Sequence, residues 1–111
     1  MQINVEKVAG GITVARLDGR FDTTGAIAIE LPFNTLANEQ RALIVDLSNV
    51  SFMSSYGIRV LLRAAKISAG KGARLVICCP DTAVGKVLKT AGTSDLIPTY
   101  PTRDAAVAAL G

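Results

Sequence analysis

Residues 46–58 read Asp46-Leu47-Ser48-Asn49-Val50-Ser51-Phe52-Met53-Ser54-Ser55-Tyr56-Gly57-Ile58. The apolar, β-branched segment that leads into them, residues 41–47, has the length and composition of a buried central strand. Over residues 55–69 the apolar side chains recur at helical spacing, and the glycines at 70 and 72 are typical of a helix end. We therefore predict a strand, a hydroxyl-rich loop over residues 48–53, and a helix that begins near Ser55.

Residues 1–19 predict a β-hairpin. Ile3 and Val5 alternate with polar residues, and residues 9–11 supply a turn with two glycines. Residues 12–17 are extended again, and Asp18-Gly19 is expected to end this second strand.

A helix is predicted over residues 23–38. Ile27, Leu31 and Leu36 recur with helical spacing, and the Asp22 carboxylate can cap the first turn by accepting its free amide hydrogens. Pro32 lies in the interior, where a proline is expected to kink the helix or split it in two.

The remaining segments complete an alternation of strands and helices. We predict strands at residues 74–79 and 96–99 and helices at residues 82–90 and 103–110, the last capped by Thr102. This order predicts an α/β fold in one domain, residues 1–111. Its mixed sheet would have four to five strands, an N-terminal hairpin and parallel central strands, packed with about four helices.

The composition makes metal and hydrolytic chemistry poor candidates. The chain has no histidine, which is the usual general base near neutral pH and the commonest metal ligand. Its two cysteines, Cys78 and Cys79, are adjacent, so their side chains are expected to point to opposite faces of a strand and a disulfide between them would be strained. We interpret them as buried packing residues in a reducing compartment and expect no metal site.

Motifs for cofactors and nucleic acids are missing. No glycine-rich stretch matches a phosphate-binding loop, no carboxylate pair is spaced as a general acid and base, and only five residues are aromatic. We expect no cofactor, no enzymatic activity and no direct nucleic-acid binding. The longest apolar run is residues 75–79, far short of the roughly 20 residues of a membrane span, and no signal peptide is evident. A cytoplasmic protein without membrane insertion is the expectation.

The net charge of +3 hides an asymmetry along the chain. Residues 51–94 carry seven basic residues against one acidic residue, whereas the remainder carries five basic and eight acidic residues. A basic centre favours an acidic partner surface, a phosphate or a nucleic acid, although it is equally typical of a solvated surface. Arg59, Arg63 and Lys66 fall on one face of the helix that begins near Ser55.

The 46–58 segment resembles the STAS family, whose bacterial regulators carry a pattern like D-L-S-x-V-x-F-M-D-S-S-G-L at a strand-to-helix junction. The match is ungapped, and Ile58 stands in place of the final leucine. The turn Leu17-Asp18-Gly19-Arg20-Phe21-Asp22 is similar to the family's L-x-G-x-L-D, and the order of elements agrees over essentially the whole chain. The matching residues of the main pattern are Asp46, Leu47, Ser48, Val50, Phe52, Met53, Ser55 and Gly57.

The resemblance implies an anti-sigma-factor antagonist. In that family the unphosphorylated protein binds an anti-sigma factor, a serine kinase of the histidine-kinase-like ATPase type, and phosphorylation of the serine that matches Ser55 releases it. A serine phosphatase resets the system. The family's usual aspartate is Ser54 here, which removes an acidic determinant and makes Ser54 an alternative phosphorylation site, and Tyr56 replaces a small residue.

Two interpretations of the serine pair remain open, because serine is common at helix starts as a cap and the same position favours a phosphate. An alternative function is a STAS subunit that docks on an ATPase of a lipid-transport complex without a phosphoswitch; a third is a basic nucleic-acid binder. For the antagonist we predict phosphorylation at Ser55. The predicted partner-binding residues are Asp22, Met53, Ser54, Tyr56, Gly57, Arg59, Arg63 and Lys66.

Overall fold

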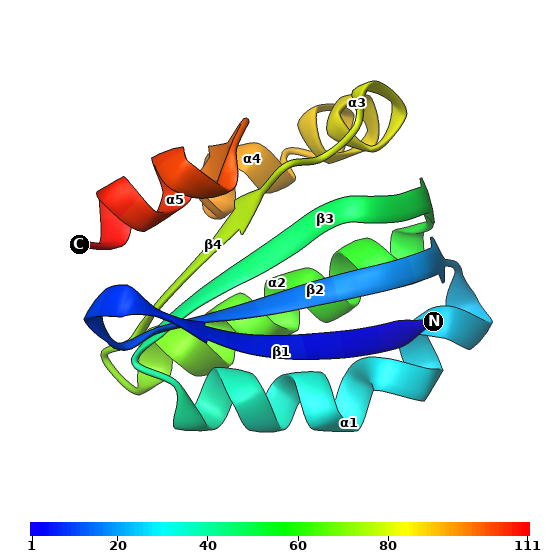
Figure 1. Cartoon of the computed structure of the whole chain (residues 1–111). Helices are drawn as coiled ribbons and strands as arrows, with labels where there is room; N and C mark the ends of the chain where they lie inside the picture. Colours follow the sequence, from blue (N-terminus) through cyan, green and yellow to red (C-terminus); the bar gives the residue numbers. More distant parts are fainter.

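A five-stranded sheet forms the centre of the computed structural model, which describes residues 1–111 (Figure 1). Strand β1 (Gln2–Val8) leads through a short 3-10 turn, η1 (Ala9–Gly11), into β2 (Ile12–Phe21) and α1 (Thr23–Glu39). Then come β3 (Ala42–Met53), α2 (Ser55–Gly70), β4 (Arg74–Cys78) and α3 (Thr82–Thr90). The chain closes with α4 (Thr93–Leu96), β5 (Thr99–Tyr100) and α5 (Arg103–Leu110).

The strands lie in the order β1-β2-β3-β4-β5, with β1 antiparallel to β2 and every other neighbour pair parallel. The predicted mixed sheet with an N-terminal hairpin and parallel central strands is therefore confirmed. The structure has five α-helices instead of about four, because a single turn, α4, precedes β5. Leu96 belongs to that turn, so the predicted strand at residues 96–99 is shifted to Thr99–Tyr100.

Helices cover both faces of the sheet (Figure 1). The larger core lies between the sheet and helices α1, α2 and α3, and Phe21, Phe33 and Leu61 are among its fully buried side chains. A smaller apolar cluster on the other face packs Ala106 of α5 against β2, β3 and β4. None of the helices combines the length and the hydrophobicity of a membrane-spanning segment.

Strands β2 and β3 are longer than the sequence predicts. The predicted loop at residues 48–53 is wrong, because β3 continues to Met53, and β2 does not end at Asp18-Gly19 but runs on to Phe21. Each extension provides the hydrogen-bonding partner of the other, with Phe21 opposite Met53. Register shifts between Arg16 and Asp18 and between Gly19 and Arg20 keep the two strands paired.

Helix α1 is continuous through Pro32, so the predicted split is wrong. Of the predicted apolar face, Leu36 packs against the larger core, but Ile27 and Leu31 are 60% and 77% exposed. Ile29 and Phe33 are buried instead, and they anchor the helix to the sheet on both sides of the proline. Helix α1 carries apolar residues on all its sides, so their spacing alone does not specify which side faces the core.

Candidate partner-binding site

Two helix starts lie side by side at one end of the sheet. Strands β2 and β3 are parallel neighbours whose last residues, Phe21 and Met53, are register partners. A single capping residue follows each strand, Asp22 before α1 and Ser54 before α2. The amide-rich, partly positive starts of both helices therefore gather at the same edge of the molecule.

Ser54 holds this junction together through three hydrogen bonds. Its backbone N–H and its hydroxyl both donate to the carbonyl oxygen of Phe21, each over 2.9 Å. Its Oγ also accepts a hydrogen bond of 3.1 Å from the amide of Gly57, which caps α2. The Ser54 hydroxyl is thus committed to the fold as both donor and acceptor.

Ser55 differs from its neighbour. It is the first residue of α2, its side chain is exposed, and its hydroxyl makes no hydrogen bond within the chain. The structure therefore separates the two serines that the sequence left as alternatives, with Ser54 as the cap and Ser55 free at the helix start.

Asp22 caps α1 in the same way that Ser54 caps α2. Its Oδ1 accepts a hydrogen bond of 2.8 Å from the Gly25 amide, and its Oδ2 lies 3.6 Å from Nε of Arg20. The Gly25 hydrogen bond, with a smaller contribution from Arg20, lowers the pKa of this carboxyl below its usual value. Asp22 is therefore a negative group at the edge of the site.

Met53 and Gly57 support the site from beneath. Met53 is 5% exposed and packs in the larger core, so it offers no surface to a partner. Gly57 is buried too, and a Cβ there would lie 2.8 Å from the carbonyl oxygen of Phe21. Both residues set the position of the α2 start.

Tyr56 links the two helices. Its hydroxyl donates a hydrogen bond of 3.1 Å to Oε1 of Glu30 in α1. The Glu30 carboxylate accepts this bond and raises the pKa of Tyr56 above its usual value. The bulk of Tyr56, which is half-buried, is thus accommodated between α1 and α2.

The three predicted basic residues lie along a groove between α2 and α4. Arg59, Arg63 and Lys66 are all exposed. The groove is open and has a volume of about 690 Å³. Its apolar lining includes Leu62 and Leu96, and the latter is 70% exposed. The surface therefore combines positive charge with exposed apolar area.

Sequence reasoning missed one exposed pair at this end of the sheet. The guanidinium of Arg20 lies 4.4 Å from the ring centroid of Phe52, and the two residues are register partners on β2 and β3. Phe52 is 40% exposed. The loop prediction for residues 48–53 hid this pair, because only the strand alternation places Phe52 on the face opposite to Met53.

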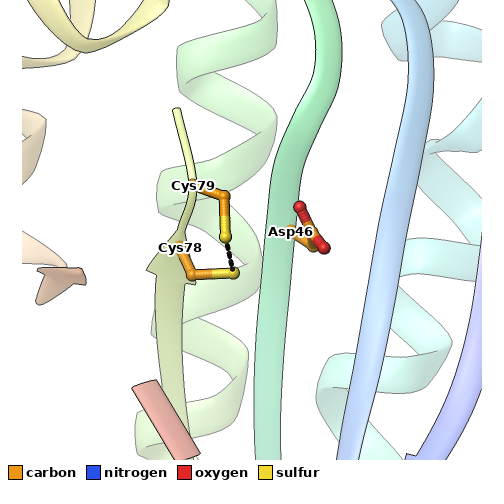
Figure 2. Close-up of side chains that lie close together, drawn as sticks. All are labelled: Asp46, Cys78 and Cys79. Carbon is orange, nitrogen blue, oxygen red and sulfur yellow. Dashed lines mark hydrogen bonds between the residues drawn. The ribbon is translucent and has the colours of Figure 1, made fainter. Parts of the chain in front are cut away.

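The two cysteines do not point to opposite faces as expected. Cys78 ends β4, but Cys79 has φ +62° and lies outside the strand, so its side chain turns back toward that of Cys78 (Figure 2). Asp46 of β3 completes a small cluster with them. Both carboxylate oxygens of Asp46 already accept hydrogen bonds, from the Ser48 amide at 2.8 Å and from Arg103 at 2.9 Å, so these two partners fix the orientation of the carboxylate.

Known proteins resemble this chain in sequence and in fold. BtrV of Bordetella bronchiseptica is 28% identical over 110 residues, which cover 98% of this chain and 94% of that protein. An anti-sigma F factor antagonist of Paenibacillus polymyxa is 26% identical over 102 residues, covering 90% of this chain and 86% of that protein. The crystal structure of an anti-sigma factor antagonist from Mycobacterium paratuberculosis is 28% identical and superposes with a TM-score of 0.88, covering 98% of this chain and 92% of that one.

The STAS domain family matches residues 3–106, nearly the whole chain. The matched region includes the 46–58 segment, the paired strand ends and both helix starts. The chain belongs to the STAS domain family.

Proposed function

We propose that this protein is an anti-sigma-factor antagonist whose binding surface is controlled by phosphorylation of Ser55. Unphosphorylated, it binds an anti-sigma factor, a serine kinase of the histidine-kinase-like ATPase type; phosphorylated, it is released, and a serine phosphatase restores it. The observation that carries the proposal is the contrast between the two serines. The Ser54 hydroxyl is engaged in two hydrogen bonds, whereas the Ser55 hydroxyl is exposed and free to accept a phosphoryl group.

The names of the relatives support the same proposal. The Paenibacillus polymyxa protein is an anti-sigma F factor antagonist, and the Mycobacterium paratuberculosis structure is that of an anti-sigma factor antagonist. Such proteins act by binding, so the protein would be a regulatory module and not an enzyme.

The position of Ser55 explains how a phosphate would act without unfolding the protein. A phosphate brings a charge of about −2, and the first turn of a helix favours negative charge through its free amide hydrogens and its dipole. Helix α2 would therefore stay intact when Ser55 is modified. The change would be felt at the surface, where a bulky anion would replace a small neutral hydroxyl.

The face of α2 that carries Ser55 also carries the basic residues. Arg59 follows Ser55 by four residues, and Arg63 follows Arg59 by another four, so the three side chains line one side of the helix. A phosphate on Ser55 would be attracted to Arg59 and would offset positive charge that an acidic partner surface could otherwise use. The partner would be released because its attraction to the basic residues of α2 is weakened and because the phosphate is bulky at the contact.

The test is phosphorylation by the cognate anti-sigma kinase with ATP, followed by intact mass and peptide mapping. We expect one phosphate on wild type and on Ser54→Ala, located at Ser55, and none on Ser55→Ala. Isothermal titration calorimetry should then show that the unphosphorylated protein binds the kinase and that the phosphorylated protein does not.

Two outcomes would overturn the proposal in different ways. Phosphate on Ser54 would place the switch on the capping residue. Absence of phosphate on wild type, with stable binding to a transport ATPase, would favour the alternative role of a docking subunit in a lipid-transport complex.

A further inference from the structure

Cys78 and Cys79 form a vicinal thiol pair whose sulfur atoms already face each other. The Cys79 thiol donates to the Cys78 sulfur over a distance of 2.9 Å (Figure 2). Cys79 is the single non-glycine residue with a positive φ, at +62°, a conformation that a residue with a Cβ seldom adopts. Without that conformation the side chain would leave the strand end on the opposite side.

The two thiols differ in their access to solvent. Cys78 is fully buried in the smaller apolar cluster beneath α5, whereas Cys79 is partly exposed at its margin. A small reagent can therefore reach Cys79 first, and Cys78 is placed to react only with Cys79. This is the arrangement of an attacking thiol and a resolving thiol.

A metal ion is a weaker explanation of the same cluster. Asp46 is the third member of the cluster, and its carboxylate already accepts hydrogen bonds from the Ser48 amide and from Arg103. Two thiols and one carboxylate are one ligand short of the closed, four-coordinate site of structural zinc, and the carboxylate is already paired with Arg103.

We propose that Cys78 and Cys79 are a reversible redox modification site, oxidised to a vicinal disulfide by low-molecular-weight disulfides. The Cys79 thiolate attacks one sulfur of the small disulfide, which forms a mixed disulfide and expels one small thiolate. The Cys78 sulfur then attacks the Cys79 sulfur, the protein disulfide forms, and the second small thiolate leaves. Two protein thiols are oxidised, one small disulfide is reduced, and the two protons released by the cysteines end on the two small thiols.

The order of the two steps follows from burial. Burial, with hydrogen bonding to Cys79 and the charge of Asp46, raises the pKa of the Cys78 thiol, so Cys78 is the weaker nucleophile of the pair and the more accessible Cys79 reacts first. The S–S distance must shorten from 2.9 Å to the roughly 2.0 Å of a covalent disulfide. Because adjacent cysteines close a small, strained ring, the product should be reduced easily by ordinary thiols.

The pair lies where β4 passes into α3 and beneath α5. The Cys79 amide donates to the carbonyl oxygen of Tyr100 in β5 over 2.9 Å, and Asp81 caps α3 two residues further on. Oxidation would therefore act on the junction of β4, β5 and α3, away from the Ser55 edge. This inference is independent of the proposed phosphoswitch.

The experiment treats the full-length protein with glutathione disulfide, alkylates the remaining thiols and measures the intact mass. We expect wild type to lose both alkylatable thiols without retaining glutathione, and the peptide of residues 75–86 to contain the disulfide. A mild thiol reductant should restore both sites. Cys78→Ser should instead keep one glutathione on Cys79, and Cys79→Ser should stay largely unmodified because Cys78 is buried.

Three results would overturn the proposal: retention of glutathione on wild-type Cys79, a disulfide between two chains, or no reaction of wild type. If a variant fails to fold, the wild-type measurement alone still tests the proposal. Circular dichroism of Cys78→Ser and of Cys78→Ala shows whether each variant is folded. If only Cys78→Ser is unfolded, the polar hydroxyl in the buried position is the cause.

Discussion

At the scale of single residues, Gly57 lies where the first turn of α2 packs tightly against the end of β2. A Cβ at this position would lie 2.8 Å from the Phe21 carbonyl oxygen and 3.0 Å from two carbons of its ring. We predict that Gly57→Ala destabilises the protein by about 1–3 kcal/mol, because backbone and a buried ring would have to move. Urea denaturation of wild type and variant measures the difference.

Gly70 provides the matched control for this substitution. It lies in the same helix and is exposed, and a Cβ added there would meet no atom of another segment within 4 Å. Gly70→Ala should be neutral or should stabilise the protein by at most about 1 kcal/mol, since alanine favours helix more than glycine does. Equal stability of the two variants would show that α2 does not depend on the close approach at Gly57.

The two serines should also differ in their effect on stability. Ser54→Ala removes the cap of α2 and a hydrogen bond to Phe21, and should cost about 1 kcal/mol. Ser55→Ala changes an exposed side chain without a partner and should stay within about 0.5 kcal/mol of wild type. Thermal or urea unfolding checks both; a larger loss for Ser55→Ala would mean that this hydroxyl has a structural role.

At the scale of elements, an ion pair anchors α5 to β3. Nη2 of Arg103, the first residue of α5, lies 2.9 Å from Oδ2 of Asp46, which is 3% exposed. Arg103 also lies 3.3 Å from Glu6 on β1. The position of the terminal helix therefore depends on a carboxylate that is largely shielded from water.

Because of this ion pair, we predict that the free energy of unfolding decreases in acid. Burial alone would raise the pKa of Asp46, but hydrogen bonds from the Ser48 amide and from Arg103 outweigh it and lower the net pKa. The pKa of an aspartate in the unfolded chain is about 3.9, and the stabilisation by the ion pair is fully present above that pH. It is lost as the pH falls through the lower pKa that Asp46 has in the folded protein. Asp46→Asn should cost on the order of 2 kcal/mol at neutral pH.

Urea unfolding at neutral and acidic pH measures this contribution, with Glu39→Gln as the control. Glu39 is exposed at the end of α1 and forms no ion pair. The wild-type protein and Glu39→Gln should lose stability in acid, and Asp46→Asn should lose less. If Asp46→Asn had the same pH dependence as wild type, another carboxylate would be responsible.

At the scale of the whole molecule, the excess of basic residues between residues 51 and 94 includes several exposed side chains of α2 and its end. Arg59 and Arg63 lie beside the groove between α2 and α4, whereas Lys71 is exposed at the far end of α2. If the kinase docks on this groove, Arg59→Glu and Arg63→Glu should slow association on the order of tenfold at low ionic strength. The effect should shrink as salt screens the charges.

Lys71→Glu makes the same change in net charge outside the groove and should have a much smaller effect on the association rate. Stopped-flow or surface plasmon resonance at several salt concentrations compares the three variants. Equal slowing by all three would indicate attraction by net charge alone, without docking on the groove.

Much of the fold follows from local rules that a single sequence contains. The hairpin, the strand at residues 41–47 and the helices after Ser55 and Arg103 were predictable because apolar periodicity and turn residues act over a few positions. The caps Asp22 and Thr102 were predictable for the same reason, since each cap bonds an amide three residues away.

Apart from the single turn α4, the sequence by itself therefore determined the order of elements, the mixed sheet and the presence of a serine pair at the start of α2. Only the tertiary structure decided that β2 and β3 extend to Phe21 and Met53, that Ser54 is the cap and Ser55 is free, and that Cys79 turns back toward Cys78. Local preferences cannot decide these features, because each depends on contacts between segments far apart in the chain, such as the Phe21 carbonyl oxygen that Ser54 binds from 33 residues away.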